Sequence, residues 1–128
     1  MGTTETAKVF IENKDIPWEE AGPGIKRKIM AYDEKLMVVK VAFEKGAVGT
    51  LHQHHHIQIT HIESGMFEVE IGGEKKLLKA GDAFFIPSNV LHGAVCLEPG
   101  VLIDVFSPMR EDFIDNRGSQ RNRKYSPE

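Results

Sequence analysis

Five of the six histidines in this 128-residue chain lie between positions 52 and 61, inside the stretch GAVGTLHQHHHIQITHIESG at residues 46–65. Its apolar residues are isoleucine, leucine and valine, and it has no helix-forming run, which is typical of two strands joined by a turn. Side chains alternate between the two faces of a strand. His52 and His54 are therefore expected to point the same way. Gln58 points the same way too if the alternation of faces continues through the turn. Two imidazoles and an amide oxygen form part of a metal site.

The simplest fourth ligand is His92, the one histidine outside this stretch. The competing interpretation is a solvated histidine-rich loop or a purification tag. A tag stands uninterrupted at a terminus, whereas this cluster is internal and is flanked by strand-like sequence. The spacing therefore favours a metal site.

The composition, 41% hydrophobic and 27% charged, indicates one ordinary globular domain. The sequence has no long apolar run and no signal-peptide core, so we expect a cytoplasmic protein without a membrane role. Cys96 is the sole cysteine and is expected to be a small buried residue. A net charge of −3 predicts no general attraction to nucleic acid, and the one basic segment, residues 117–124, is hydrophilic.

From residue 25 onward, short strand-like segments follow one another with almost no helical periodicity. Gly72 and Gly73 are expected to form a tight hairpin turn, and only residues 110–118 offer a helical turn or two. Many short strands separated by glycine and proline predict an all-β antiparallel sandwich or barrel.

We expect three regions: an N-terminal arm at 1–24 with a short strand at 9–11, a barrel at 25–114, and a disordered polar tail at 115–128. Trp18 is expected to be a packing anchor of the arm. The apolar outer faces of residues 36–44 and 101–107 predict a homodimer formed by sheet packing.

Two spaced motifs resemble the signatures of the cupin superfamily. In the first, five residues separate Gly46 from His52, one separates His52 from His54, three separate His54 from Gln58, and six separate Gln58 from Gly65. In the second, five residues separate Gly81 from Pro87, and four separate Pro87 from His92. The resemblance implies a double-stranded β-helix, or jelly-roll barrel, that holds one divalent transition metal ion through the three histidines and Gln58. The chain departs from the common cupin pattern at Gln58, where a glutamate is usual, and at Asn89 and Cys96 in the second motif.

Three neutral imidazoles and a neutral amide leave the +2 charge of an ion uncompensated. Such a site is a stronger Lewis acid and favours an anionic, oxygen-rich ligand. The alternative is a decayed site that holds a metal weakly. Nickel, zinc, iron, manganese and copper all tolerate this ligand set, so the sequence does not name the ion.

Residues 18–39 and 97–114 resemble the KdgF-type cupins of pectin and alginate breakdown, and IDVFSPMREDF at 103–113 is the most specific piece. Members of that family linearise 4,5-unsaturated monouronates, the products of polysaccharide lyases, into 5-keto-4-deoxyuronate. The resemblance implies that Asp104, Phe106 and Arg110 are the catalytic residues. Whether the substrate comes from pectin or from alginate stays open.

The residues of this segment are compatible with that role, because even-numbered positions share one face of a strand. An aspartate among apolar residues is costly to bury unless it is paired or does chemistry. Simpler interpretations are an ion pair between Asp104 and Arg110, a core position for Phe106, and a pair between Arg110 and Asp112.

The remaining histidines are unassigned. His56 lies an even number of positions from His52 and His54, so it could line the cavity. His55 and His61 are expected to support the ligands or to lie at the surface.

We therefore expect a non-redox, metal-dependent enzyme that opens the ring of a small anionic sugar acid. Asp104 would move protons, Arg110 would hold the carboxylate, and Phe106 would shape the pocket. The alternatives are a non-catalytic sugar-acid-binding cupin and a metal-dependent cupin oxygenase.

Overall fold

The computed structural model describes residues 9–115, so the tail predicted beyond this range lies outside the described residues. Its elements are a 3-10 helix Asn13–Asp15, strands β1 Glu19–Gly22, β2 Ile25–Tyr32, β3 Met37–Phe43, β4 Val48–His52, β5 Ile57–Ile71, β6 Glu74–Lys79, β7 Ala83–Ile86 and β8 His92–Ser107, and helix α1 Glu111–Asp115. The Gly72-Gly73 turn joins β5 to β6, and the predicted helical turn forms as α1.

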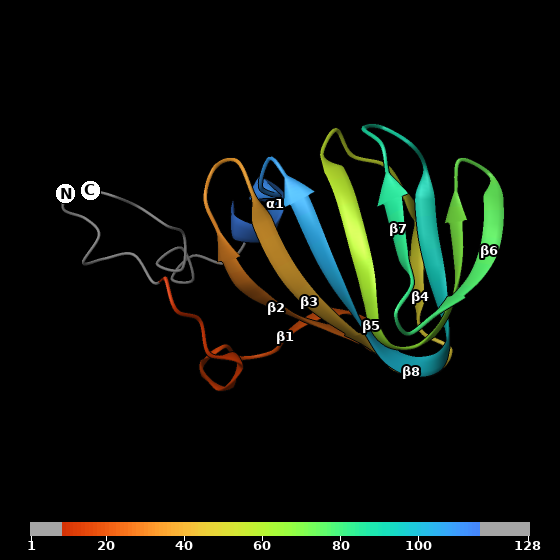
Figure 1. Cartoon of the computed structure of the whole chain (residues 1–128), viewed down its shortest axis with the longest axis horizontal. Helices are drawn as coiled ribbons and strands as arrows, with labels where there is room; N and C mark the ends of the chain where they lie inside the picture. Colours follow the sequence, from red (N-terminus) through yellow and green to blue (C-terminus); the bar gives the residue numbers. More distant parts are fainter. Residues whose placement is uncertain (1–8, 116–128) are drawn as a thin grey trace.

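The strands pair antiparallel in the order β1-β2-β3-β8-β5-β6, while β4 pairs with β8 and β7 pairs with β5. The two long strands, β5 and β8, take part in both layers of the barrel (Figure 1). The Ser107 half of β8 pairs with β3 and with the Ile57 half of β5, and the His92 half of β8 pairs with β4 and with the Ile71 half of β5. This arrangement confirms the predicted all-β jelly-roll fold.

Both long strands bend where two glycines bring their backbones into contact. A Cβ atom on Gly65 would lie 2.6 Å from the Cα of Gly100, and one on Gly100 would overlap the carbonyl oxygen of Ser64. Gly65 also has a φ of +89°, which side chains other than glycine rarely adopt. Register shifts beside Ser64 and Met66 mark bulges at this bend. The bulges let each strand leave one layer and enter the other.

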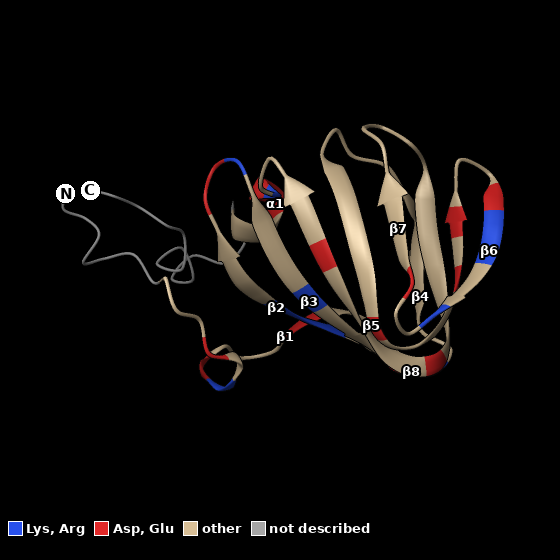
Figure 2. Ribbon diagram, viewed as in Figure 1, with Lys and Arg blue, Asp and Glu red and all other residues tan. Residues whose placement is uncertain are grey.

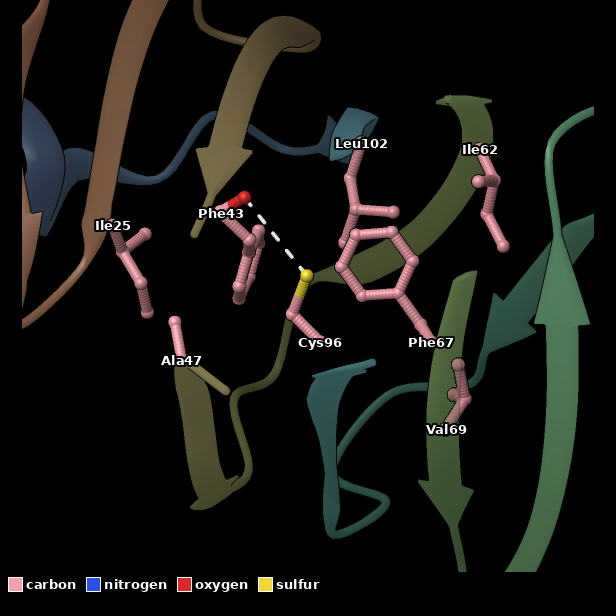
Figure 3. Packing of buried hydrophobic residues seen from close by; sticks show 8 residues of the cluster. All are labelled: Ile25, Phe43, Ala47, Ile62, Phe67, Val69, Cys96 and Leu102. Atoms are coloured by element: carbon pink, nitrogen blue, oxygen red, sulfur yellow. Dashed lines mark hydrogen bonds between the residues drawn. The ribbon is translucent and has the colours of Figure 1, made fainter. Parts of the chain in front are cut away.

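The core beyond the bend is built around Phe67 and Cys96, both fully buried. The rings of Phe43 and Phe67 meet edge to face with their centroids 5.2 Å apart. Figure 3 shows the Cys96 thiol among these rings, directed at the main-chain oxygen of Phe43. Cys96 is thus a small buried residue, as predicted. A second cluster joins α1 to the barrel; its buried members are Ile29, Tyr32, Met37, Val39, Phe106 and Ile114.

The arm differs from the prediction. Residues 9–11 form no strand, and Phe10 is 87% exposed, so this apolar segment is not packed. The short strand of the arm is instead β1, which forms a hairpin with β2 through a turn at Pro23 and Gly24. Trp18, which was predicted to be a packing anchor of the arm, is 39% exposed. The ammonium groups of Lys26 and Lys28 lie 5.8 and 4.8 Å from its ring centroid, which is cation–π geometry.

Charged side chains are unevenly spread over the ribbon. Figure 2 shows acidic and basic residues on β1, β2 and β6 and in loops, while β7 is uncharged. Within residues 9–115 the sole α-helix is the short α1, and no helix there has the length and apolar character needed to cross a membrane.

Candidate metal centre

The predicted ligands converge where β4, β5 and β8 begin or end. His52 is the last residue of β4 and lies directly opposite His92, the first residue of β8. Gln58 is the second residue of β5 and pairs in register with Phe106 of β8. His54 lies in the loop between β4 and β5, and its carbonyl oxygen accepts a hydrogen bond from the main-chain N–H of Asn89. The fold thus brings four residues from two distant segments to one place.

The three imidazoles face one another closely. Ring centroids are 4.4 Å apart for His52 and His92, 4.8 Å for His54 and His92, and 5.5 Å for His52 and His54. One ring nitrogen from each histidine lies within 4.8 Å of the others. Because metal–imidazole bonds are about 2.0–2.1 Å long, small side-chain rotations let all three reach one ion.

The protonation of these rings is set by the backbone. Each imidazole donates its Nδ1 proton to a main-chain carbonyl: Thr50 accepts from His52 at 2.9 Å, His56 from His54 at 3.0 Å, and Val90 from His92 at 2.8 Å. A neutral imidazole has a single N–H, so every Nε2 atom carries a lone pair. The Nε2 atom of His92 is buried and has no hydrogen-bond partner among the described residues. Such an atom is suited to bind a cation.

Gln58 completes the donor set. Its Nε2 atom donates to the hydroxyl of Thr60 at 2.8 Å, which turns its Oε1 atom toward His54 Nε2, 3.1 Å away. Both of these facing atoms are acceptors when the proton of His54 is on Nδ1. Two lone pairs at this distance repel unless a cation lies between them, so the residues present fit a transition metal ion.

The electrostatics of the site favour the neutral forms of His54 and His92, as metal binding requires. Burial, and then the charge of Arg110, lowers the pKa of His54 to about 4. Burial also lowers the pKa of His92, and the hydrogen bond to Val90 opposes this only in part.

Asp104 lies on β8 opposite Thr60, next to the proposed ligands. Its Oδ1 atom accepts a hydrogen bond from the Thr60 hydroxyl at 2.6 Å and a longer one, 3.4 Å, from Gln58 Nε2. Burial raises the pKa of Asp104 to about 6, although Thr60, Arg110 and Gln58 all act in the opposite direction. A carboxyl with this pKa can both accept and donate a proton near neutrality.

Arg110 precedes α1 and points to the same place, but it does not form the considered ion pair with Asp104. Its Nε and Nη2 atoms donate instead to the two carboxylate oxygens of Asp112, at 3.0 and 2.8 Å. The guanidinium lies 5.2 Å from the ring centroid of Phe106. Phe106 is 2% exposed and its ring is also 5.8 Å from that of His54. Phe106 is therefore both a core residue and a wall of the site.

Six of the residues described above line one cavity of about 350 Å³: His52, Gln58, His92, Asp104, Phe106 and Arg110. Its polar end carries His52, Gln58, His92, Asp104 and Arg110. The rest of its wall is largely apolar and comes from β2, β3, β4 and β8; it includes Ile25, Val41, Phe43, Val48 and Leu102. A concave, largely apolar site with a few converging polar groups is typical of small-molecule binding.

His56, which the sequence analysis left unassigned, is not among the residues that line the cavity. Its ring is buried, and its Nε2 atom lies 2.9 Å from the Glu111 carboxylate at the start of α1. His55 is exposed and stacks on His56 with a centroid distance of 3.9 Å, and His61 is exposed on β5.

The sequence analysis also missed Thr60, Glu111 and Arg27. Alternation along β5 places Thr60 on the face of Gln58, and this was the available signal for it. No sequence pattern links Glu111 to the histidine stretch, or separates Arg27 from the lysines beside it.

Comparison with known proteins agrees with this geometry. The sequence model of the cupin domain family matches residues 39–106. The chain is 53% identical over 109 residues to the pectin degradation protein KdgF of Dickeya dadantii (strain 3937), which covers 84% of this chain and 98% of that protein.

Solved structures give the same result. KdgF from Halomonas sp. is 50% identical, with a TM-score of 0.80 over 84% of this chain and 99% of its own. An RmlC-like cupin from Shewanella frigidimarina is 45% identical, with a TM-score of 0.81 over 84% and 96%. By its domain match and by identity over most of its length, the chain belongs to the KdgF family of the cupin superfamily.

Proposed function

We propose that this protein is a metal-dependent enzyme of pectin or alginate breakdown that converts 4,5-unsaturated monouronates to linear 5-keto-4-deoxyuronate. One observation carries the proposal: Gln58, Thr60 and Asp104 form a hydrogen-bonded chain that joins the metal centre to a carboxyl of raised pKa inside one cavity. The name of the Dickeya relative supports the pathway.

His52, His54, Gln58 and His92 would hold one divalent transition metal ion. When bound, such an ion supplies Lewis-acid stabilisation of negative charge on substrate oxygens. The neutral donors leave the charge of the ion available for an anionic substrate.

The reaction is an isomerisation, so its proton balance is simple. The bond between C1 and the ring oxygen breaks, the hydroxyl on C1 loses its proton as the aldehyde forms, and the former ring oxygen becomes an enolate oxygen on C5. This enolate gains a proton at C4 and becomes the C5 ketone. Asp104 can take the first proton and deliver the second, because its raised pKa lies close to neutrality.

Arg110 would orient the substrate carboxylate. Asp112 occupies its Nε and Nη2 atoms, which leaves Nη1 to donate to a ligand. The ring of Phe106 supports the guanidinium and presents an apolar surface to the sugar ring.

The test is incubation with lyase-generated 4,5-unsaturated galacturonate, followed by product analysis and by the loss of enol-ether absorbance against a no-enzyme control. We expect turnover that a chelator abolishes and a divalent metal restores. Asp104→Ala should lose most of the rate with its metal content unchanged, whereas His52→Ala should lose metal as well.

Three outcomes would contradict the proposal. Full turnover by Asp104→Ala removes that residue from the mechanism. Binding of the uronate without conversion indicates a sensor, and oxygen consumption during turnover indicates an oxygenase.

We also propose a homodimer that forms through the outer face of the layer that contains β3, β7, the Ile57 half of β5 and the Ser107 half of β8. There Ile59 pairs in register with Val105 on one side and Phe85 on the other, and Val105 pairs with Val38. Ile59 and Phe85 are 51% and 55% exposed, and water contact with such side chains is unfavourable. A monomer mass in sedimentation equilibrium, or a dimer unaffected by Ile59→Glu, would refute this.

A further inference from the structure

The cavity contains a second arginine that the proposed mechanism does not use. Arg27 lies on β2, where it pairs in register with Val41 of β3 and Glu19 of β1. Its side chain is 20% exposed, and its Nε atom donates to a Glu19 carboxylate oxygen at 2.8 Å. Its guanidinium lies 3.9 Å from the ring centroid of Phe113. Arg27 is thus held in place from two sides while it lines the cavity.

Arg27 and Arg110 approach the site from different elements: Arg27 lies on β2, and Arg110 lies between β8 and α1. In the register of the sheet, Arg27 lies beside Val41 of β3, and Val41 lies beside Leu102 of β8. Asp104 is two residues further along β8, closer to Phe106 and its partner Gln58. Arg27 therefore starts from the apolar part of the wall and reaches the ring of Phe113, which Arg110 also contacts, at 4.3 Å. Because both guanidinium groups lie on the ring of Phe113, a ligand whose carboxylate is held at Arg110 would meet Arg27 with another part of the same molecule.

Arg27 donates to Glu19 through its Nε atom, so its two Nη atoms can donate hydrogen bonds to oxygens of a ligand. Its remaining N–H groups lie in a largely apolar part of the cavity, where an unmatched donor is costly. A ligand hydroxyl that meets these donors would be favoured over one that points elsewhere.

The chemistry of the proposed substrates identifies that hydroxyl, and this step rests on the proposed function. Lyase elimination removes the stereochemistry at C4 and C5. Pectin-derived and alginate-derived unsaturated monouronates therefore share the carboxylate and the enol ether and differ only in configuration at C2. We propose that Arg27 donates a hydrogen bond to the C2 hydroxyl and so sets the preference between these two epimers.

The experiment compares kcat/KM for both unsaturated epimers in wild type, Arg27→Ala and Arg27→Lys. Loss of one hydrogen bond from a guanidinium in a buried site predicts that Arg27→Ala changes the epimer ratio by about ten-fold. Metal content should be unchanged. Lys26→Ala, next to it on β2 but stacked on Trp18, is the matched control and should leave the ratio as in wild type.

An equal loss of kcat/KM on both epimers, or an unchanged ratio, would overturn the proposal. If Arg27→Ala does not fold, Arg27→Lys carries the test, because it keeps the charge but lacks the planar set of donors. Calorimetric binding of D-glucuronate and D-mannuronate, which also differ only at C2, separates this proposal from the reaction. Wild type that converts neither unsaturated epimer refutes the proposed function, whereas an affinity ratio that Arg27→Ala leaves unchanged refutes the role of Arg27.

Discussion

Asp104 should make the metal-free protein less stable at neutral pH than it would be without this carboxyl. Asparagine at this position keeps the shape of the side chain and an acceptor oxygen for the Thr60 hydroxyl, but it does not titrate. We therefore expect Asp104→Asn to lose turnover and yet to resist unfolding better than wild type at neutral pH.

The magnitude follows from the pKa. Burial raises the pKa of Asp104 from 3.8 to about 6, so the folded chain binds this proton more tightly than the unfolded chain does. The carboxyl thus favours folding fully below its unfolded pKa and loses that contribution as the pH rises through about 6. The complete effect is about 3 kcal/mol, since one pKa unit corresponds to about 1.4 kcal/mol. About 2 kcal/mol of it should be lost between about pH 4.5 and about pH 7.5.

The assay is urea unfolding of both proteins in chelator across this pH range. A chelator is needed because a bound cation would stabilise the ionised carboxylate and reduce the effect. Other titrating groups are common to the two proteins, so the difference between their unfolding free energies isolates Asp104. That difference should grow with pH in favour of Asp104→Asn. A difference that does not change with pH would show that Asp104 titrates normally, and the argument from burial would fail.

Three further perturbations test other parts of the structure. Gln58→Glu should bind metal more tightly but turn over more slowly, as metal titration and steady-state rates would show; a faster variant would contradict the role given to the amide. Glu111→Ala should destabilise the fold by about 0.5–1 kcal/mol in urea unfolding with little change in metal content, because it removes the contact of a half-exposed carboxylate with His56; Glu111→Gln, which keeps an acceptor, should recover much of the loss. Gly100→Ala should destabilise the fold by about 3 kcal/mol or more in urea unfolding, because the new methyl group would overlap Ser64 backbone.

Much of the fold could be predicted because its signals are local. The alternation around Phe67 and the Gly72-Gly73 pair identify a strand and its turn without knowledge of the rest of the chain. The arm shows where local signals end. The residues at 9–11 look like a strand, but strand formation requires a partner, and the sequence does not reveal that β1 rather than this segment pairs with β2.

The candidate site likewise has residues that local sequence signals predict and residues that only the folded structure reveals. The spacing of His52, His54 and Gln58 lies in one stretch, so their convergence could be expected, although His54 reaches the site from the loop between β4 and β5 and not from a strand. The contact between His56 and Glu111 joins residues 55 positions apart and depends on where α1 packs. Arg27 lies between two lysines, and only the register of β2 turns it toward the cavity while Lys26 stacks on Trp18.

The departure of Gln58 from the common cupin glutamate gains a physical reason from its neighbours. An amide has both an acceptor and donors, so Gln58 can offer its oxygen to the metal centre while its nitrogen donates to Thr60. The Thr60 hydroxyl is then free to donate its single proton to Asp104. A glutamate has acceptors only and would compete with Asp104 for that proton. It would also place a second negative charge near Asp104, which raises the pKa of a carboxyl. The proposed neutral ligand Gln58 and the proposed acid Asp104 are therefore linked through Thr60, and a change at Gln58 should alter the titration of Asp104 as well as metal binding.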